Sequence, residues 1–155
     1  RNTRRQRQMC IRDRISALGT EAEVNALKSF GTNFGMTFQL IDDAIDYSSN
    51  KKILGKNTGD DFKEGKITLP IILAYGRSND KEKKFWERTI SDLNQNDGDF
   101  EMALEIINKY QCIEDTLTRA NHFSNVAIDS VDIFKDNIYK EKLVSLVSKS
   151  VSRIY

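Results

Sequence analysis

The sequence has little of several features that mark whole classes of protein. Its 155 residues include two cysteines, Cys10 and Cys112, too few for the disulfide framework of a small secreted protein. We therefore expect a reducing, cytoplasmic setting. No run approaches the roughly 20 apolar residues of a membrane-spanning helix. Residues 1–14 lack the apolar core of a signal peptide.

The sequence also lacks strand alternation, internal repeats and low-complexity tracts. One proline, eight glycines and 39% apolar residues suit a mainly helical chain, and the length suits one domain or part of a larger one. We predict an all-α fold with short connections apart from a loop over residues 48–67. Apolar residues recur at helical spacing over residues 20–47, 69–76, 80–94, 99–110, 113–136 and 138–155.

Four local expectations follow from these patterns. Thr20 begins the first helix, with Glu23 placed to complete a capping box. Leu93 and Leu146 lie on the apolar sides of their helices, so we expect both to point inward. His122, the only histidine, falls opposite an apolar face, so we expect a surface or supporting position and no catalytic role.

Charge is uneven along the chain. Residues 1–14 hold six arginines and one aspartate, a balance of +5, which leaves −4 for residues 15–155 because the whole chain carries +1. A basic arm can bind nucleic acid or anionic lipid, but this one has no aromatic residues and no apolar face. It also resembles translated adapter sequence. We therefore expect a non-native or disordered terminus and no nucleic-acid partner.

The first predicted helix ends in an acidic stripe. Gln39, Asp42, Asp43 and Asp46 fall at i, i+3, i+4 and i+7, so they share one face, and apolar residues lie on both sides of it. Carboxylates at this spacing repel one another, and a hard divalent cation removes the repulsion. The alternative is a solvated acidic surface, which the apolar flanks disfavour. The stripe predicts a magnesium site in a cleft.

A long loop follows over residues 51–67. It contains Lys56 and Lys66 among glycines and acidic residues, and loops of this length are often functional lids. Its lysines can bind phosphates that a metal already holds. An ordinary mobile surface loop is the alternative.

FQLIDDAIDY (38–47) and LGKNTGDDFKEGKITLP (54–70) resemble, in order and spacing, the second aspartate-rich motif and the following lysine-bearing loop of trans-isoprenyl diphosphate synthases. The long-chain bacterial polyprenyl type is the most similar, over about residues 15–155. The resemblance implies an isoprenoid synthase helical bundle around a central cavity. It also implies head-to-tail (1'-4) condensation of an allylic diphosphate with isopentenyl diphosphate, for example towards a quinone side chain, and usually a homodimer.

The resemblance also implies roles for individual residues. Asp42 and Asp46 would hold Mg²⁺ bound to the allylic diphosphate, and Asp43 would act nearby through water or directly. Gln39 would lie beside the cation or the diphosphate. Lys56 and Lys66 would neutralise the departing phosphates.

The chain departs from the family pattern because it has no first aspartate-rich motif before residue 38. We therefore expect residues 15–155 to be the C-terminal half of such an enzyme, inactive alone. Two alternatives stay open. One is a non-catalytic partner subunit of a heteromeric prenyl synthase, and the other is a class I terpene cyclase, whose usual second motif differs from DDAID.

Overall fold

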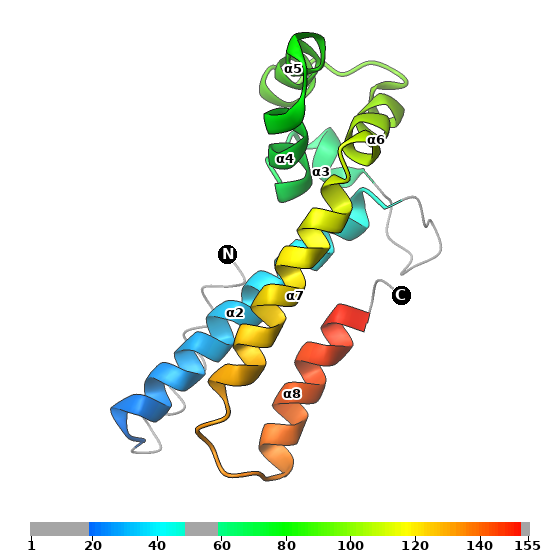
Figure 1. Cartoon of the computed structure of the whole chain (residues 1–155). Helices are drawn as coiled ribbons and strands as arrows, with labels where there is room; N and C mark the ends of the chain where they lie inside the picture. The colour runs from blue at the N-terminus through cyan, green and yellow to red at the C-terminus, as the bar shows by residue number, and fades with distance from the viewer. Residues whose placement is uncertain (1–18, 49–58, 153–155) are drawn as a thin grey trace. The chain divides into compact units, whose positions relative to one another are not determined.

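The computed structural model describes residues 19–48 and 59–152, so the expectations for residues 1–14 and for Lys56 lie outside the described residues. All regular structure in those ranges is helical, which confirms the all-α prediction (Figure 1). The helices are α2 (Glu21–Asp46), α3 (Asp60–Lys63), α4 (Leu69–Arg77), α5 (Asp80–Trp86), the π-helical η1 (Glu87–Ser91), α6 (Asp99–Lys109), α7 (Cys112–Ser130) and α8 (Ile138–Val151).

The helices begin where the sequence supplies caps. At α2 the Thr20 N–H donates to Glu23 Oε2 over 2.8 Å, and the Glu23 N–H donates to Thr20 Oγ1 over 3.3 Å, which confirms the predicted capping box. Asn79 and Glu82 form a second box at α5. At α4 Thr68 is the N-cap residue, as the sequence predicts for a helix with Pro70 in its first turn, but its hydroxyl makes no capping hydrogen bond.

The described chain forms two compact units. The first unit contains the residues up to Ile41 and from Thr118 onwards, and the second unit runs from Asp42 to Leu117. In the first unit α2 and α7 are joined by a hydrogen bond between the Ser29 and Ser130 hydroxyls and by one that the Thr37 hydroxyl donates to the Ala120 carbonyl. These pairs run in opposite directions along the chain, so the two helices are antiparallel.

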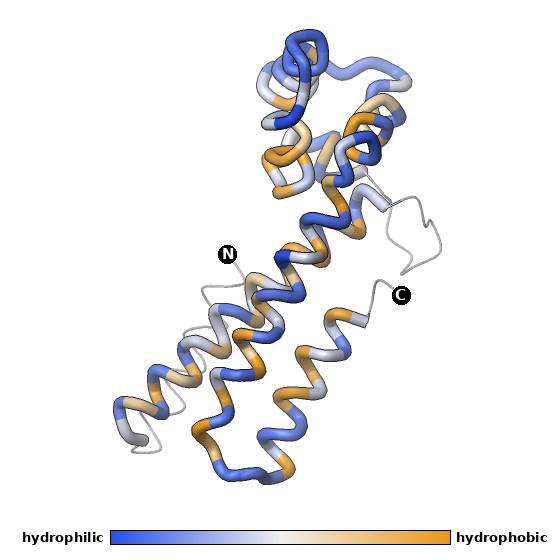
Figure 2. Tube along the Cα trace, in the orientation of Figure 1, coloured by the Kyte–Doolittle hydropathy of each residue, from blue (hydrophilic) through white to orange (hydrophobic). Residues whose placement is uncertain are grey.

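The core of the first unit lies among α2, α7 and α8. Phe30, Ala127, Val131 and Val147 are buried together, and Figure 2 shows orange and blue alternating along α8, as an amphipathic helix requires. Leu146, in contrast, is 48% exposed, so the expectation that it points inward is wrong. The helical period carries it beyond the edge of the buried stripe that holds Val147.

Helix α7 ends at Ser130, earlier than the predicted residue 136. The Val131 N–H and the Phe134 N–H bond to carbonyls three residues back, which tightens the chain into turns. Lys140 holds the connection, because its Nζ donates to Asp136 over 3.0 Å and to the Phe134 carbonyl over 3.3 Å. His122 is exposed on α7, as expected.

The core of the second unit packs α4, α5 and α6 around large side chains. Ile107 is fully buried and Trp86 is 2% exposed. The Trp86 indole N–H donates to Ser78 over 3.1 Å, and the Ser78 hydroxyl donates to the Ala74 carbonyl over 2.8 Å. The indole therefore fixes α5 against the C-terminal end of α4 while its polar atom stays satisfied.

The helix predicted over residues 80–94 changes character part-way. After α5 the chain widens into the π-helical η1, where the Asp92 N–H bonds to the Glu87 carbonyl. Such a turn shifts the faces of the helix relative to an α-helix. Leu93 follows with a positive φ and is 58% exposed, so the prediction that it points inward is wrong.

An ion pair joins η1 to α6. The two guanidinium nitrogens of Arg88 donate to the two carboxylate oxygens of Asp99, each over 2.8 Å, and the Asn96 N–H donates to Asp99 over 2.7 Å. The Arg88 guanidinium, and then the Asn96 N–H, hold the pKa of the Asp99 carboxyl below its ordinary value, although its partial burial opposes this.

We predict that Asp99→Asn lowers the melting temperature at neutral pH and that the difference disappears in acid. A carboxyl whose pKa is depressed in the folded state stabilises the fold above its unfolded pKa of about 4, and this stability is lost as the pH falls through the folded pKa. Thermal unfolding of the two chains from pH 7 downwards measures this. A difference that is the same at every pH would contradict the prediction.

Candidate functional site

The acidic stripe lies at the C-terminal end of α2. Asp43 is 7% exposed, Asp42 and Asp46 are half-buried, and Gln39, one turn earlier on the same helix, is exposed. Leu40, Ile41, Ala44 and Ile45 are all buried. The predicted apolar flanks are therefore confirmed at these four positions but wrong at Phe38, which is 36% exposed. The three carboxylates are not simply spread over a solvated surface.

Asp46 connects α2 to the short helix α3. Its backbone carbonyl accepts a hydrogen bond from the Gly59 N–H over 3.0 Å, and its Oδ2 accepts one from the Asp61 N–H over 3.0 Å. Gly59 has φ +86°, and a Cβ added there would lie 2.7 Å from the Phe100 ring. A glycine is required at this turn for both reasons. Helix α3 lies inside the predicted loop over residues 48–67, which is therefore partly helical.

The environment of Asp46 favours a cation. Burial raises the pKa of the Asp46 carboxyl, and the nearby Asp61 and Asp60 carboxylates raise it further, while backbone N–H groups of the same two residues oppose the rise. A carboxylate that is disfavoured by burial and by neighbouring negative charge gains most from a bound cation. Carboxylate oxygens are the ligands that Mg²⁺ prefers, so this donor set fits that metal.

Lys66 belongs to the same network. Its Nζ lies 2.7 Å from Asp61 Oδ1 and 2.8 Å from Glu64 Oε2. The hydrogen bonds that Lys66 donates to Asp61 and then to Glu64 raise the pKa of Lys66, so it is charged at neutral pH. Its side chain is 52% exposed, and exposed ion pairs are weak. The ammonium group can therefore exchange these carboxylates for a phosphate.

Two hydroxyls in this region have no hydrogen-bond partner within the described part of the chain, those of Tyr47 and Thr68. Tyr47 is 1% exposed and Thr68 is 8% exposed. Burial raises the pKa of Tyr47, with Thr68 opposing the rise and the Asp46 carboxylate adding to it. The sequence analysis did not identify these residues. The only sequence signal for a role of these residues was that Tyr47 follows Asp46 directly and Thr68 lies two residues after Lys66.

The structure thus brings Asp46 and Lys66 into one network through Asp61. The sequence analysis gave Asp61 no role, although the residue lies between the two motifs. In the described ranges no three histidine, cysteine or carboxylate groups gather closely enough to hold a metal by themselves. Mg²⁺ often takes one or two protein carboxylates together with water and substrate phosphates. The roles of Asp42, Asp43, Asp46, Gln39 and Lys66 remain predictions.

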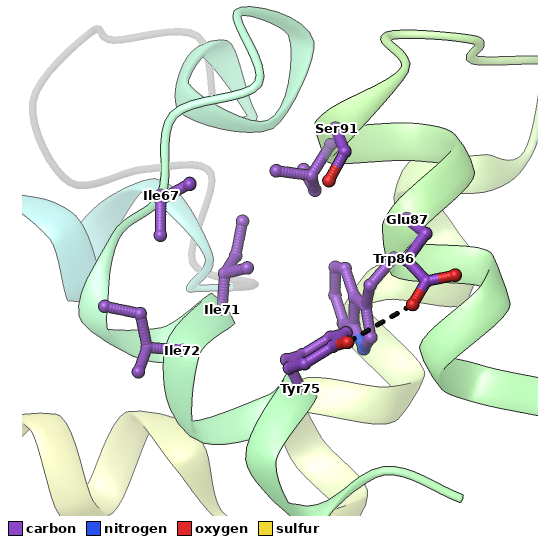
Figure 3. A pocket seen from close by; sticks show the side chains of 8 residues that line it. Ile67, Ile71, Ile72, Tyr75, Trp86, Glu87 and Ser91 are labelled. Atoms are coloured by element: carbon purple, nitrogen blue, oxygen red, sulfur yellow. Dashed lines mark hydrogen bonds between the residues drawn. The ribbon is translucent and has the colours of Figure 1, made fainter. Parts of the chain in front are cut away.

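A separate apolar pocket of about 230 Å³ lies in the second unit. Figure 3 shows Ile67, Ile71 and Ile72 on one side and Trp86 on the other, with the Tyr75 hydroxyl donating to Glu87 over 3.2 Å. None of the predicted site residues lines it. No helix in the described ranges is long and apolar enough to cross a membrane.

Comparison with known proteins agrees with the motifs. The polyprenyl synthetase family matches residues 9–107, which is more than half of the chain. The chain belongs to the polyprenyl synthetase family. The match includes the acidic end of α2 and the segment that carries Lys66.

Named relatives of this polyprenyl synthetase chain include two octaprenyl diphosphate synthases. The enzyme from Haemophilus influenzae is 37% identical over 141 residues, which cover 91% of this chain and 43% of the relative. The enzyme from Escherichia coli is 34% identical and is matched over 86% of this chain and 41% of the relative. The chain therefore spans less than half the length of these relatives.

Solved structures confirm the isoprenoid synthase helical fold. A decaprenyl diphosphate synthase from Rhodobacter capsulatus matches with a TM-score of 0.85 at 34% identity, over 92% of this chain and 44% of that structure. A polyprenyl synthase from Caulobacter crescentus, complexed with calcium and isoprenyl diphosphate, matches with a TM-score of 0.79 at 41% identity, over 89% and 42%.

Proposed function

We propose that this chain supplies the acidic side of the active site of a polyprenyl diphosphate synthase. The reaction is 1'-4 condensation of isopentenyl diphosphate with an allylic diphosphate. One observation carries the proposal. The Asp46 carboxylate accepts a hydrogen bond from the Asp61 N–H, and the Asp61 carboxylate accepts one from the Lys66 ammonium group. Acidic and basic groups that suit a metal-bound diphosphate therefore lie in one network.

The proposed roles follow from the chemistry of the groups. Asp42 and Asp46 would hold Mg²⁺, which when bound supplies Lewis-acid stabilisation of the departing diphosphate. Asp43 would support them through water or directly, and Gln39 would lie beside the cation or diphosphate. Lys66, and Lys56 outside the described residues, would donate to phosphate oxygens as negative charge develops. Buried apolar residues flanking the stripe would limit water at an allylic cation.

Two observations on relatives support these assignments. The Caulobacter crescentus structure contains a divalent cation and an isoprenyl diphosphate. Two of the relatives are named octaprenyl diphosphate synthases, which favours a long polyprenyl product. We propose Mg²⁺ as the natural metal and a homodimer for the whole enzyme. A cytoplasmic location and a quinone-precursor product stay predictions from the sequence.

A chimera tests the function. This chain would replace the matching segment of the Haemophilus influenzae octaprenyl diphosphate synthase, and the product would be assayed with farnesyl and isopentenyl diphosphates. We expect Mg²⁺-dependent prenyl transfer by the chimera and none by the 155-residue chain alone. Turnover by the isolated chain would contradict the predicted need for further residues. A folded chimera without activity would favour the non-catalytic partner subunit.

We predict that Lys66→Met in this chimera raises the KM for the allylic diphosphate. A hydrogen bond to a charged group contributes about 1.5–3 kcal/mol, so the expected rise is roughly tenfold to a hundredfold. Lys63→Met is the matched control, because Lys63 is exposed on α3 and its Nζ lies 3.8 Å from Asp60. Equal effects of the two substitutions would show that general charge, and not Lys66, matters.

A further inference from the structure

The contacts around Asp46 form a ring with one link missing. Asp46 Oδ2 accepts from the Asp61 N–H, Asp61 Oδ1 accepts from Lys66 Nζ, and the Lys66 carbonyl accepts from the Thr68 N–H over 3.1 Å. Tyr47, the neighbour of Asp46 in the chain, then faces Thr68. The hydroxyls of Tyr47 and Thr68 do not form a hydrogen bond, and this is the missing link.

A missing link in this place needs a physical explanation. Buried polar atoms in native proteins are nearly always hydrogen-bonded, and each exception calls for a specific reason. Tyr47 and Thr68 are two such exceptions, both more than nine-tenths buried. The Thr68 hydroxyl is close enough to the phenol to act on the Tyr47 pKa as a hydrogen-bond partner. A small movement of either residue therefore brings the hydroxyls into bonding geometry.

Lys66 links the proposed phosphate position to Thr68. Its Nζ is held by Asp61 and Glu64, while its backbone is bonded to Asp61 on one side and to Thr68 on the other. A shift of Lys66 on binding a phosphate would be passed to Thr68 through the hydrogen bond between the Lys66 carbonyl and the Thr68 N–H. Thr68 is the N-cap residue of α4, but its hydroxyl makes no capping hydrogen bond to the helix. That hydroxyl is therefore available to Tyr47.

We propose that Tyr47 and Thr68 are positioning residues whose hydroxyls pair when Lys66 binds a diphosphate, closing the ring that fixes Lys66 relative to Asp46. This inference rests on the proposed function, because it assigns a role to residues behind that diphosphate site. It adds two residues that bind neither metal nor substrate. The hydroxyl pair would then be made in the diphosphate-bound chain and not in the chain without diphosphate.

Thermal unfolding of the 155-residue chain tests this with and without Mg²⁺ and inorganic pyrophosphate. In the ligand-free chain, Tyr47→Phe and Thr68→Val remove unpartnered hydroxyls, so we expect the melting temperature to stay the same or rise. Lower melting temperatures in both variants, with no further loss in the double variant, would show that the pair is already made. That result would overturn the linkage to ligand.

In the bound chain the expectation reverses. Pyrophosphate with Mg²⁺ raises the wild-type melting temperature by mass action, and we expect either substitution to weaken binding about fivefold, which corresponds to about 1 kcal/mol. We expect the double variant to lose no more affinity than a single variant. Thr68→Ser keeps the hydroxyl, so we expect it to bind like the wild type. Unchanged affinity in the variants would overturn the inference and leave the diphosphate site standing. If the wild-type chain does not bind pyrophosphate, both the proposed diphosphate site and the proposed role of Tyr47 and Thr68 are wrong.

Discussion

Replacing both Asp42 and Asp46 by alanine is expected to abolish prenyl transfer by the chimera, with kcat at least about a thousandfold lower. A bound metal contributes several kcal/mol to the stabilisation of a departing anion, and about 4 kcal/mol corresponds to a thousandfold in rate. Both side chains are half-buried at the end of α2 and lie four residues apart, about one helical turn. Product formation from labelled isopentenyl diphosphate measures the loss.

The control separates loss of metal from loss of fold. Asp46 also accepts the Asp61 N–H, so Asp42→Asn/Asp46→Asn keeps an acceptor there while removing both charges. Asp129→Asn, at an exposed position on α7, removes one charge without touching the network. We expect the double asparagine variant to stay folded and inactive and the Asp129 variant to stay active. Substantial activity in the folded double asparagine variant would contradict the metal role.

Ile107→Ala is expected to have the largest effect on stability, a loss of about 2–5 kcal/mol in the free energy of unfolding. Ile107 is fully buried on α6, in the core cluster that includes Trp86. Because whole domains are stable by only about 5–15 kcal/mol, we expect the melting temperature to fall by about 10 °C or more. Trp86 is the only tryptophan, so its fluorescence follows the unfolding of the second unit.

Ile72→Ala is the matched control. Ile72 undergoes the same chemical change in the same unit, but it is 51% exposed on α4. Exposed substitutions of this kind stay within about 0.5 kcal/mol. Similar losses for the two variants would show that the second unit is not held together by the cluster around Ile107.

The sequence predicted the helices well where local signals were strong. The capping box at Thr20 and Pro70 in the first turn of α4 both act within a few residues, so their effect is visible in the sequence. The all-helical fold followed from the helical spacing of apolar residues, and the family followed from two adjoining motifs. These are the parts of the structure that depend on short-range physics or on resemblance.

The errors in the predicted helices arose where the backbone departs from regular α-helical geometry. Leu93 follows the π-helical η1 and points outward, and α7 ends at Ser130, where the chain tightens into turns. Neither effect has a signal in a 3.6-residue period. The link from Asp46 through Asp61 to Lys66 was missed for another reason, because residues 46 and 61 are 15 positions apart in the sequence and meet only through the fold.

The most direct test of the account is a crystal structure of the chain with Mn²⁺, as a stand-in for Mg²⁺, and pyrophosphate. We expect an anomalous peak at about 2.1 Å from carboxylate oxygens of Asp42 and Asp46, with pyrophosphate on the metal and Lys66 turned from Asp61 to a phosphate oxygen. A peak elsewhere, or carboxylates of Asp42 and Asp46 turned into bulk solvent away from the bound pyrophosphate, would contradict the proposed function.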